Sequence, residues 1–319
     1  MFNIDPSVFL EQSISDEIRE QNAMIIERLG ALPDRWQFEP HVIRQRRIDG
    51  LDAFPPGPNV DHAETISIDG PGGDLPLRVI APQTRPSRGV YLHIHGGGWT
   101  IGAADFQDMK LQRIAENTGL TVVSVEYRLA PEHPYPAGPD DCEAAALWVH
   151  ENCRSRFGGE LMTIGGESAG AHLSVVALIR LRDKHQLTPF AGANLVAGCY
   201  DHARTPSSRA FSQDMLVLGD RDISNFTKCF LANGGDIADP DISPIHADLS
   251  GLPPALFSVG TYDALMDDSL FMAVKWMSAG NKTDLAVFPG GCHVFQSFPS
   301  AMAEDSLQRM DDFLNGVAG

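Results

Sequence analysis

The chain has 319 residues and carries 42 acidic against 24 basic side chains, a formal net charge of -18. Such a charge opposes binding to a nucleic-acid backbone or an anionic membrane surface, so we expect neither as a partner. The longest apolar stretch, residues 173–181, is too short to span a bilayer, and the first residues lack a secretory signal, which favours a cytoplasmic protein. The five cysteines lack CxxC spacing, which favours reduced thiols over disulfides or a zinc site.

The first part of the chain predicts helices. Asp5 and Pro6 are typical of a helix start and Gly30 of a helix end, so we expect one helix between them. A second short helix is predicted at residues 41–47. The Pro- and Gly-rich residues 54–58 then indicate a linker.

After this linker, short apolar runs typical of strands alternate with helical segments. Such alternation predicts an α/β fold, with a mostly parallel sheet and helices on both faces. Turn residues and a helical patch interrupt the alternation at residues 201–245, which indicates an insertion. The expected strands are residues 63–69, 75–80, 88–94, 121–126, 161–165, 193–197, 255–259 and 284–288.

One of these strands ends directly in the run His95-Gly96-Gly97-Gly98. Consecutive glycines leave their backbone N–H groups uncovered, so that these groups can converge on one oxygen atom. We therefore predict that Gly97 and Gly98 form part of an oxyanion hole. His95 and Gly96 are expected to shape the turn.

A second motif, residues 166–170 (GESAG), lies between an expected strand and an expected buried helix. This is the context of a nucleophile elbow, in which small residues such as Gly166 and Gly170 permit a tight turn. The turn would place the Ser168 hydroxyl at the positive end of the helix, with the N–H of Ala169 as a third oxyanion-hole donor. Each motif alone also arises by chance, so the prediction depends on the pair.

A serine hydroxyl is a poor nucleophile without a base, and the base needs an acid to orient it. In folds with this elbow both follow the serine in the chain, beyond the ends of later strands. Asp263 and His293 follow the last two expected strands. Competing candidates in the same loop or elsewhere are Asp267 and Asp268 for the acid, and His95, His133, His172 and His246 for the base.

Together these motifs resemble the hormone-sensitive-lipase-like branch of the α/β-hydrolases, the bacterial family IV esterases, from about Leu75 to the C-terminus. Residues 126–132 (EYRLAPE) resemble the family's YRLAPE segment, residues 263–267 its D-P-L-x-D acid loop, and residues 293–295 its H-G-F histidine loop. The family pattern favours Asp263 over its neighbours as the acid. Departures that bear on loop shape and substrate preference are Glu167, Ala171, Ala264 and Val294.

The resemblance implies an α/β-hydrolase domain at residues 51–319, with a helical cap made by residues 1–50 and the insertion at 201–245. It also implies a serine carboxylesterase that hydrolyses short to medium acyl esters through a Ser168–His293–Asp263 triad and an acyl-enzyme. No cofactor or metal is expected, the partner is a small-molecule ester, and a homodimer is compatible with the sequence.

Three other functions compete with this reading. A serine amidase or deacetylase would use the same triad, and a non-catalytic small-molecule receptor could be built on the same scaffold. Nucleotide binding is disfavoured because neither GKS/T nor G-x-G-x-x-G accompanies the glycine run.

Overall fold

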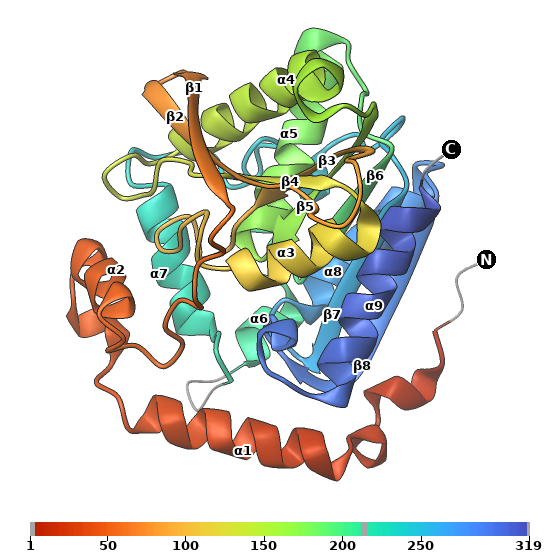
Figure 1. The fold of residues 1–319 in the computed structure, drawn as a ribbon. Helices are drawn as coiled ribbons and strands as arrows, with labels where there is room; N and C mark the ends of the chain where they lie inside the picture. The colour runs from red at the N-terminus through yellow and green to blue at the C-terminus, as the bar shows by residue number, and fades with distance from the viewer. Residues whose placement is uncertain (1–3, 212–215, 318–319) are drawn as a thin grey trace.

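The computed structural model describes residues 4–211 and 216–317, which contain one sheet of eight strands (Figure 1). The order across the sheet is β1-β2-β4-β3-β5-β6-β7-β8. The pairs β1–β2 and β2–β4 are antiparallel and the other pairs are parallel. All eight predicted strands are present: β1 Glu64–Gly70, β2 Gly73–Ile80, β3 Gly89–Ile94, β4 Thr121–Val125, β5 Leu161–Glu167, β6 Gly192–Val196, β7 Ala255–Tyr262 and β8 Thr283–Cys292.

Helices cover both faces of the sheet, which confirms the predicted α/β architecture. α3 and α9 pack on one face, and α4, α5 and α8 pack on the other (Figure 1). In the part of the chain that the structure describes, no helix is long and apolar enough to cross a membrane. The helices are α1 Asp16–Gly30, α2 Pro40–Ile48, α3 Asp108–Thr118, α4 Ala137–Phe157, α5 Ala169–His185, α6 Pro206–Ala210, α7 Asp220–Phe230, α8 Met266–Ser278 and α9 Ala301–Gly316, with short 3₁₀ helices η1 Pro6–Phe9, η2 Glu11–Ser13, η3 Arg35–Gln37, η4 Pro244–His246 and η5 Phe295–Ser297.

The N-terminal segment is not the single helix predicted to end at Gly30. Asp5 caps only the short η1, and Leu10 after it has extended backbone, which interrupts helical hydrogen bonding. α1 begins anew after Ser15, whose hydroxyl accepts the N–H of Ile18 at 3.3 Å. The prediction was wrong about where the long helix begins. The Asp-Pro pair starts only a short 3₁₀ helix, whereas the long helix starts at the cap formed by Ser15.

The centre of the sheet is apolar and buried. Every residue of β3, β4 and β6 is buried, as expected of parallel strands covered on both faces. β5, β7 and β8 are parallel and lie close together in the sheet, with only β6 between β5 and β7. Side chains that follow these three strands therefore meet at one edge of the sheet.

A buried ion-pair network joins α5 to α4 and to the loop before η4. The Arg180 guanidinium on α5 lies 2.8 Å from Asp140 and 2.6 Å from Asp241, and its side chain is 4% exposed. These carboxylates raise the pKa of Arg180 against the opposing effect of burial. Carboxylates on α4 and on the loop before η4 therefore neutralise the Arg180 cation.

Removal of this cation should destabilise the fold. We expect Arg180→Met to lower the free energy of unfolding by about 3 kcal/mol, because it leaves clustered carboxylates without a counter-ion. Urea unfolding measures the change. The control is Arg154→Met, which removes an exposed ion pair with Glu160 and should leave the midpoint unchanged. Equal shifts in the two variants would contradict the expectation.

Candidate active site

Ser168 forms the turn between β5 and α5. Its backbone angles are φ 57° and ψ -120°, a conformation that residues other than glycine rarely adopt. The turn is tight because Gly166 and Gly170 have no side chains. A Cβ on Gly166 would lie 2.0 Å from the carbonyl oxygen of Ile94, and one on Gly170 would lie 1.9 Å from it. The turn places Ser168 directly before the first N–H groups of α5, which have no partner within the helix.

A chain of hydrogen bonds connects Ser168 to two other predicted residues. Its Oγ lies 3.0 Å from Nε2 of His293, and Nδ1 of His293 lies 2.9 and 3.0 Å from the two carboxylate oxygens of Asp263. Asp263 follows β7 and His293 follows β8. Because the carboxylate only accepts, Nδ1 carries the proton and Nε2 accepts from the hydroxyl. The exposed fractions are 9% for Ser168, 5% for His293 and 0% for Asp263, so water is largely excluded.

The other carboxylates of the acid loop have different partners. Asp267 accepts the N–H of Ser207 at 2.8 Å, and Asp268 accepts the N–H of Tyr200 at 2.7 Å. Burial raises the pKa of Asp268 to about 7. Both carboxylates hold the segment that follows β6 against α8, and neither forms a hydrogen bond with His293.

The competing histidines are also placed away from Ser168. Both ring nitrogens of His172 are occupied, since Nδ1 accepts from Trp99 Nε1 at 3.1 Å and Nε2 donates to the carbonyl of Ile242 at 2.8 Å. His133 and His246 are exposed on the surface. No side chain of these three histidines forms a hydrogen bond with the Ser168 hydroxyl.

The glycine loop after β3 packs directly against the serine turn. A Cβ on Gly96 would lie 3.3 Å from that of Ser168. Gly97 and Gly98 have φ values of 119° and 58°, in the region that favours glycine, and a Cβ on Gly98 would lie 2.2 Å from the Phe226 ring. No hydrogen bond among the described residues uses the N–H of Gly97 or Gly98. Both N–H groups are therefore available to a ligand oxygen.

His95, at the start of this loop, contacts both the loop and Tyr127. Its ring stacks on Tyr127 at 4.3 Å, and its Nδ1 donates to the carbonyl oxygen of Gly96 at 2.8 Å. Burial lowers the pKa of His95 to about 4, so the ring is neutral at neutral pH.

Cys292 directly precedes His293 in the chain. Burial raises the pKa of the Cys292 thiol to about 12, which leaves the thiol unreactive.

Glu167 is a buried residue whose contacts could not be predicted from the sequence. Its carboxylate accepts from the N–H of Gly96 at 2.9 Å, from His93 Nε2 at 3.2 Å and from Lys110 Nζ at 3.2 Å. These partners lie on other elements, far away along the chain. The only signal in the sequence was that an acidic residue precedes Ser168.

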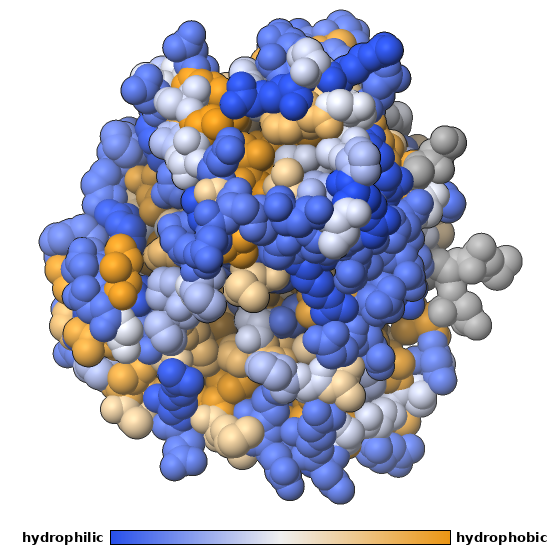
Figure 2. All heavy atoms as spheres, in the orientation of Figure 1, coloured by the Kyte–Doolittle hydropathy of each residue, from blue (hydrophilic) through white to orange (hydrophobic). Residues whose placement is uncertain are grey.

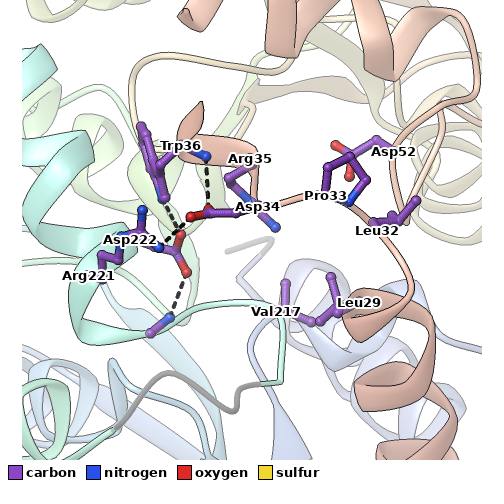
Figure 3. Close-up of a pocket in the computed structure, with 11 residues that line it drawn as sticks. Leu29, Leu32, Pro33, Asp34, Arg35, Trp36, Asp52, Val217, Arg221 and Asp222 are labelled. Atoms are coloured by element: carbon purple, nitrogen blue, oxygen red, sulfur yellow. Dashed lines mark hydrogen bonds and ion pairs between the residues drawn. The ribbon is translucent and has the colours of Figure 1, made fainter. Parts of the chain in front are cut away.

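A cavity of about 310 Å³ opens between the end of α1, η3 and the start of α7 (Figure 3). Two polar contacts cross it: Trp36 Nε1 donates to Asp222 at 2.6 Å, and Arg221 pairs with Asp34 at 2.7 Å. These contacts tie the N-terminal segment to the segment after β6. Apolar and charged side chains share the lining, which includes Leu29, Leu32, Arg35, Asp52 and Val217.

Two aromatic rings separate this cavity from the glycine loop. Trp36 lines the cavity and packs edge-on against Phe226 at 4.9 Å, and Phe226 covers Gly98. Apolar patches show at several places on the surface in Figure 2. Exposed apolar side chains include Met24 on α1 and, at the end of α2, Ile48, which are 63% and 59% exposed. Residues 1–3 and 212–215 of the two expected cap segments lie outside the described residues.

Comparison with known proteins identifies the family of this chain. Residues 91–297 match the family described as alpha/beta hydrolase fold. The chain is 36% identical over 249 residues to the carboxylic ester hydrolase LipN of Mycobacterium tuberculosis, an alignment that covers 75% of this chain and 66% of LipN. It is 35% identical over 247 residues to the carboxylesterase NlhH of the same organism, with 73% of this chain and 75% of NlhH covered.

Solved structures lead to the same family. A crystal structure described as an esterase from the bacterial hormone-sensitive lipase family aligns with a TM-score of 0.82 and 29% identity, over 96% of this chain and 99% of that one. The predicted resemblance is confirmed. The chain belongs to the α/β-hydrolase fold family, and within it to the hormone-sensitive-lipase-like carboxylesterases.

Proposed function

We propose that this carboxylesterase works through an acyl-enzyme formed on Ser168. The observation that supports this most directly is the hydrogen-bonded chain from Ser168 through His293 to Asp263, with links of 3.0 and 2.9 Å. His293 takes the hydroxyl proton as Ser168 attacks the ester carbonyl, and Asp263 orients the ring and stabilises the imidazolium that forms. His293 then protonates the leaving alcohol and activates the water that hydrolyses the acyl-enzyme.

In this mechanism the N–H groups of Gly97, Gly98 and Ala169 bind the oxyanion of the tetrahedral intermediate. Two features support this role. The first two N–H groups have no partner among the described residues, and the third belongs to the first residue of α5. Donors that are fixed before the reaction stabilise the developing charge without reorganisation. The mechanism requires no metal or cofactor.

We assign the roof over this site to residues 1–50 and 201–245, on a catalytic domain of residues 51–319. The contacts of Trp36 with Asp222 and of Asp34 with Arg221 support a roof in which the two segments act together (Figure 3). We expect such a roof to leave a closed pocket of ordinary ligand size beside Ser168 rather than an open groove. Esters with short to medium acyl chains fit this shape.

The assignment predicts how the rate depends on acyl length. Each buried methylene contributes about 0.8 kcal/mol, so kcat/KM should rise over the first carbons until the chain meets the end of the pocket, and then fall. We expect a maximum between acetyl and hexanoyl esters in a series of aryl esters, with weak action on emulsified long-chain triglyceride. A preference for chains beyond about twelve carbons would contradict the closed roof.

A matched anilide in the same series tests the function itself. A carboxylesterase should cleave the aryl ester much faster than the anilide with the same acyl group. Comparable rates on both would identify an amidase. Saturable binding of the esters without turnover would identify a receptor, and either result would overturn the proposal.

A further inference from the structure

Glu167 is the last residue of β5 and immediately precedes Ser168, yet the proposed mechanism assigns it no role. Its side chain is 4% exposed. Gly96 of the glycine loop packs against it so closely that a Cβ on Gly96 would lie 2.8 Å from the carbonyl oxygen of Glu167. Glu167 therefore lies between the serine turn and the glycine loop.

The two carboxylate oxygens of Glu167 bind different elements. Oε1 accepts the N–H of Gly96 at 2.9 Å and a side-chain N–H of Gln107. Oε2 accepts from His93 Nε2 on β3 and from Lys110 Nζ on α3, both at 3.2 Å. One side chain thus joins β5, β3, the glycine loop and the start of α3.

The protonation states in this cluster follow from its contacts. Burial lowers the pKa of His93, and Ser124 lies 3.0 Å from its Nδ1, so the ring is neutral and donates through Nε2 to Glu167. Burial acts to raise the pKa of Glu167, but the Lys110 ammonium and the hydrogen bonds from His93 and Gly96 outweigh it and hold that pKa well below its usual value. Glu167 is therefore a carboxylate whose counter-ion is Lys110.

The bond to Glu167 uses one backbone donor of the glycine loop. Because the N–H of Gly96 points to Glu167, it is not available to substrate. The next two N–H groups, of Gly97 and Gly98, are left without partners among the described residues. Glu167 is adjacent to Ser168 in the chain, so one residue connects the glycine loop to the serine turn.

We propose that Glu167 is a positioning residue that aligns the oxyanion-binding loop with Ser168 through the N–H of Gly96, and that Lys110 neutralises its charge so that it does not repel the developing oxyanion. The inference rests on the proposed function of Ser168 and of the glycine loop. It accounts for a feature in which this chain departs from the family pattern, since the longer side chain of glutamate reaches Gly96 and Lys110 at once.

Two substitutions of Glu167 test the alignment. Glu167→Met keeps the length of the side chain but removes both acceptors, and we expect kcat for an aryl butyrate to fall about 100-fold with KM nearly unchanged, because misplaced donors affect mainly the transition state. Affinity for an alkyl boronic acid, which adds to the serine and mimics the tetrahedral state, should fall by a similar factor. Glu167→Gln retains an oxygen that can accept from Gly96, although its NH₂ group then faces His93 and Lys110, so it should lose clearly less of the rate than Glu167→Met.

Lys110→Met is the second variant, and it remains informative if Glu167→Met does not fold, because Lys110 is 17% exposed at the edge of the cluster. An uncompensated carboxylate beside the oxyanion should lower kcat about tenfold without raising KM. The control is Asp108→Asn, a buried carboxyl on α3 that pairs with Arg78 and does not touch the glycine loop. It should reduce stability and leave kcat unchanged.

Comparison with Ser168→Ala separates this inference from the proposed function. If Ser168→Ala remains active, both fail. If Ser168→Ala is inactive while Glu167→Met or, where that variant does not fold, Lys110→Met keeps the wild-type kcat and boronate affinity, only the role of Glu167 is overturned. Equal losses in Glu167→Gln and Glu167→Met would also overturn it, because the oxygen facing Gly96 would then be irrelevant.

Discussion

Ser168→Ala is expected to lower kcat for ester hydrolysis by about five orders of magnitude or more, because the serine, histidine and aspartate act as a unit. Among the described residues the hydroxyl makes one hydrogen bond, to His293 at 3.0 Å, and alanine fits the same turn between Gly166 and Gly170. The fold should therefore survive. Initial rates on an aryl butyrate and a urea unfolding curve measure the two expectations.

Ser174→Ala provides a matched control for this loss. Ser174 lies on the same helix and is buried, but its hydroxyl donates only to the carbonyl of Gly170 at 2.7 Å. We expect this variant to keep nearly the full rate. Retention of a tenth or more of the wild-type rate by Ser168→Ala would remove Ser168 from the role of nucleophile.

Asp263→Asn should lower the acylation rate by about three to four orders of magnitude. Asparagine can turn its NH₂ group toward Nδ1 of His293, which then accepts a hydrogen bond and leaves the ring proton on Nε2. In that tautomer the ring cannot accept the proton of Ser168. Pre-steady-state release of the aryl alcohol measures the acylation step.

Asp267→Asn separates the two carboxylates of the acid loop. Asp267 accepts the N–H of Ser207 and does not contact His293, so we expect a loss of less than about tenfold, as is usual for a contact remote from the reacting atoms. A larger loss in Asp267→Asn than in Asp263→Asn, with both variants folded, would transfer the role of the acid to Asp267.

The sheet could be predicted because its strands are nearly continuous apolar runs in a regular α/β alternation. The start of α1 could not, because Asp5-Pro6 and Ser15 are both good N-caps, and only the extended backbone at Leu10 decides that the long helix begins at the second. Local sequence describes each cap but not the break between them.

Within the site, the positions of Ser168, Asp263 and His293 were predictable because each follows a strand in a recognisable motif. The surroundings of Glu167 were not, because its partners Gly96 and Lys110 become neighbours only when the strands are ordered β3-β5 and α3 packs beside them. The contacts of the cavity depend in the same way on two segments that are far apart in the chain.

Asp267 and Asp268 have a consequence for how such enzymes can be re-engineered. They bind Ser207 and Tyr200 from the first turn of α8, a few residues after Asp263, so the segment after β6 and the acid loop form one mechanical unit. A graft from a relative that replaced residues 201–245 alone would exchange Thr205 and Ser207, whose hydroxyls bind the Asp268 carboxylate and the N–H of Asp267. Grafts should therefore carry the first turn of α8 with them, and substrate range and the alignment of Asp263 are traits that have to evolve together.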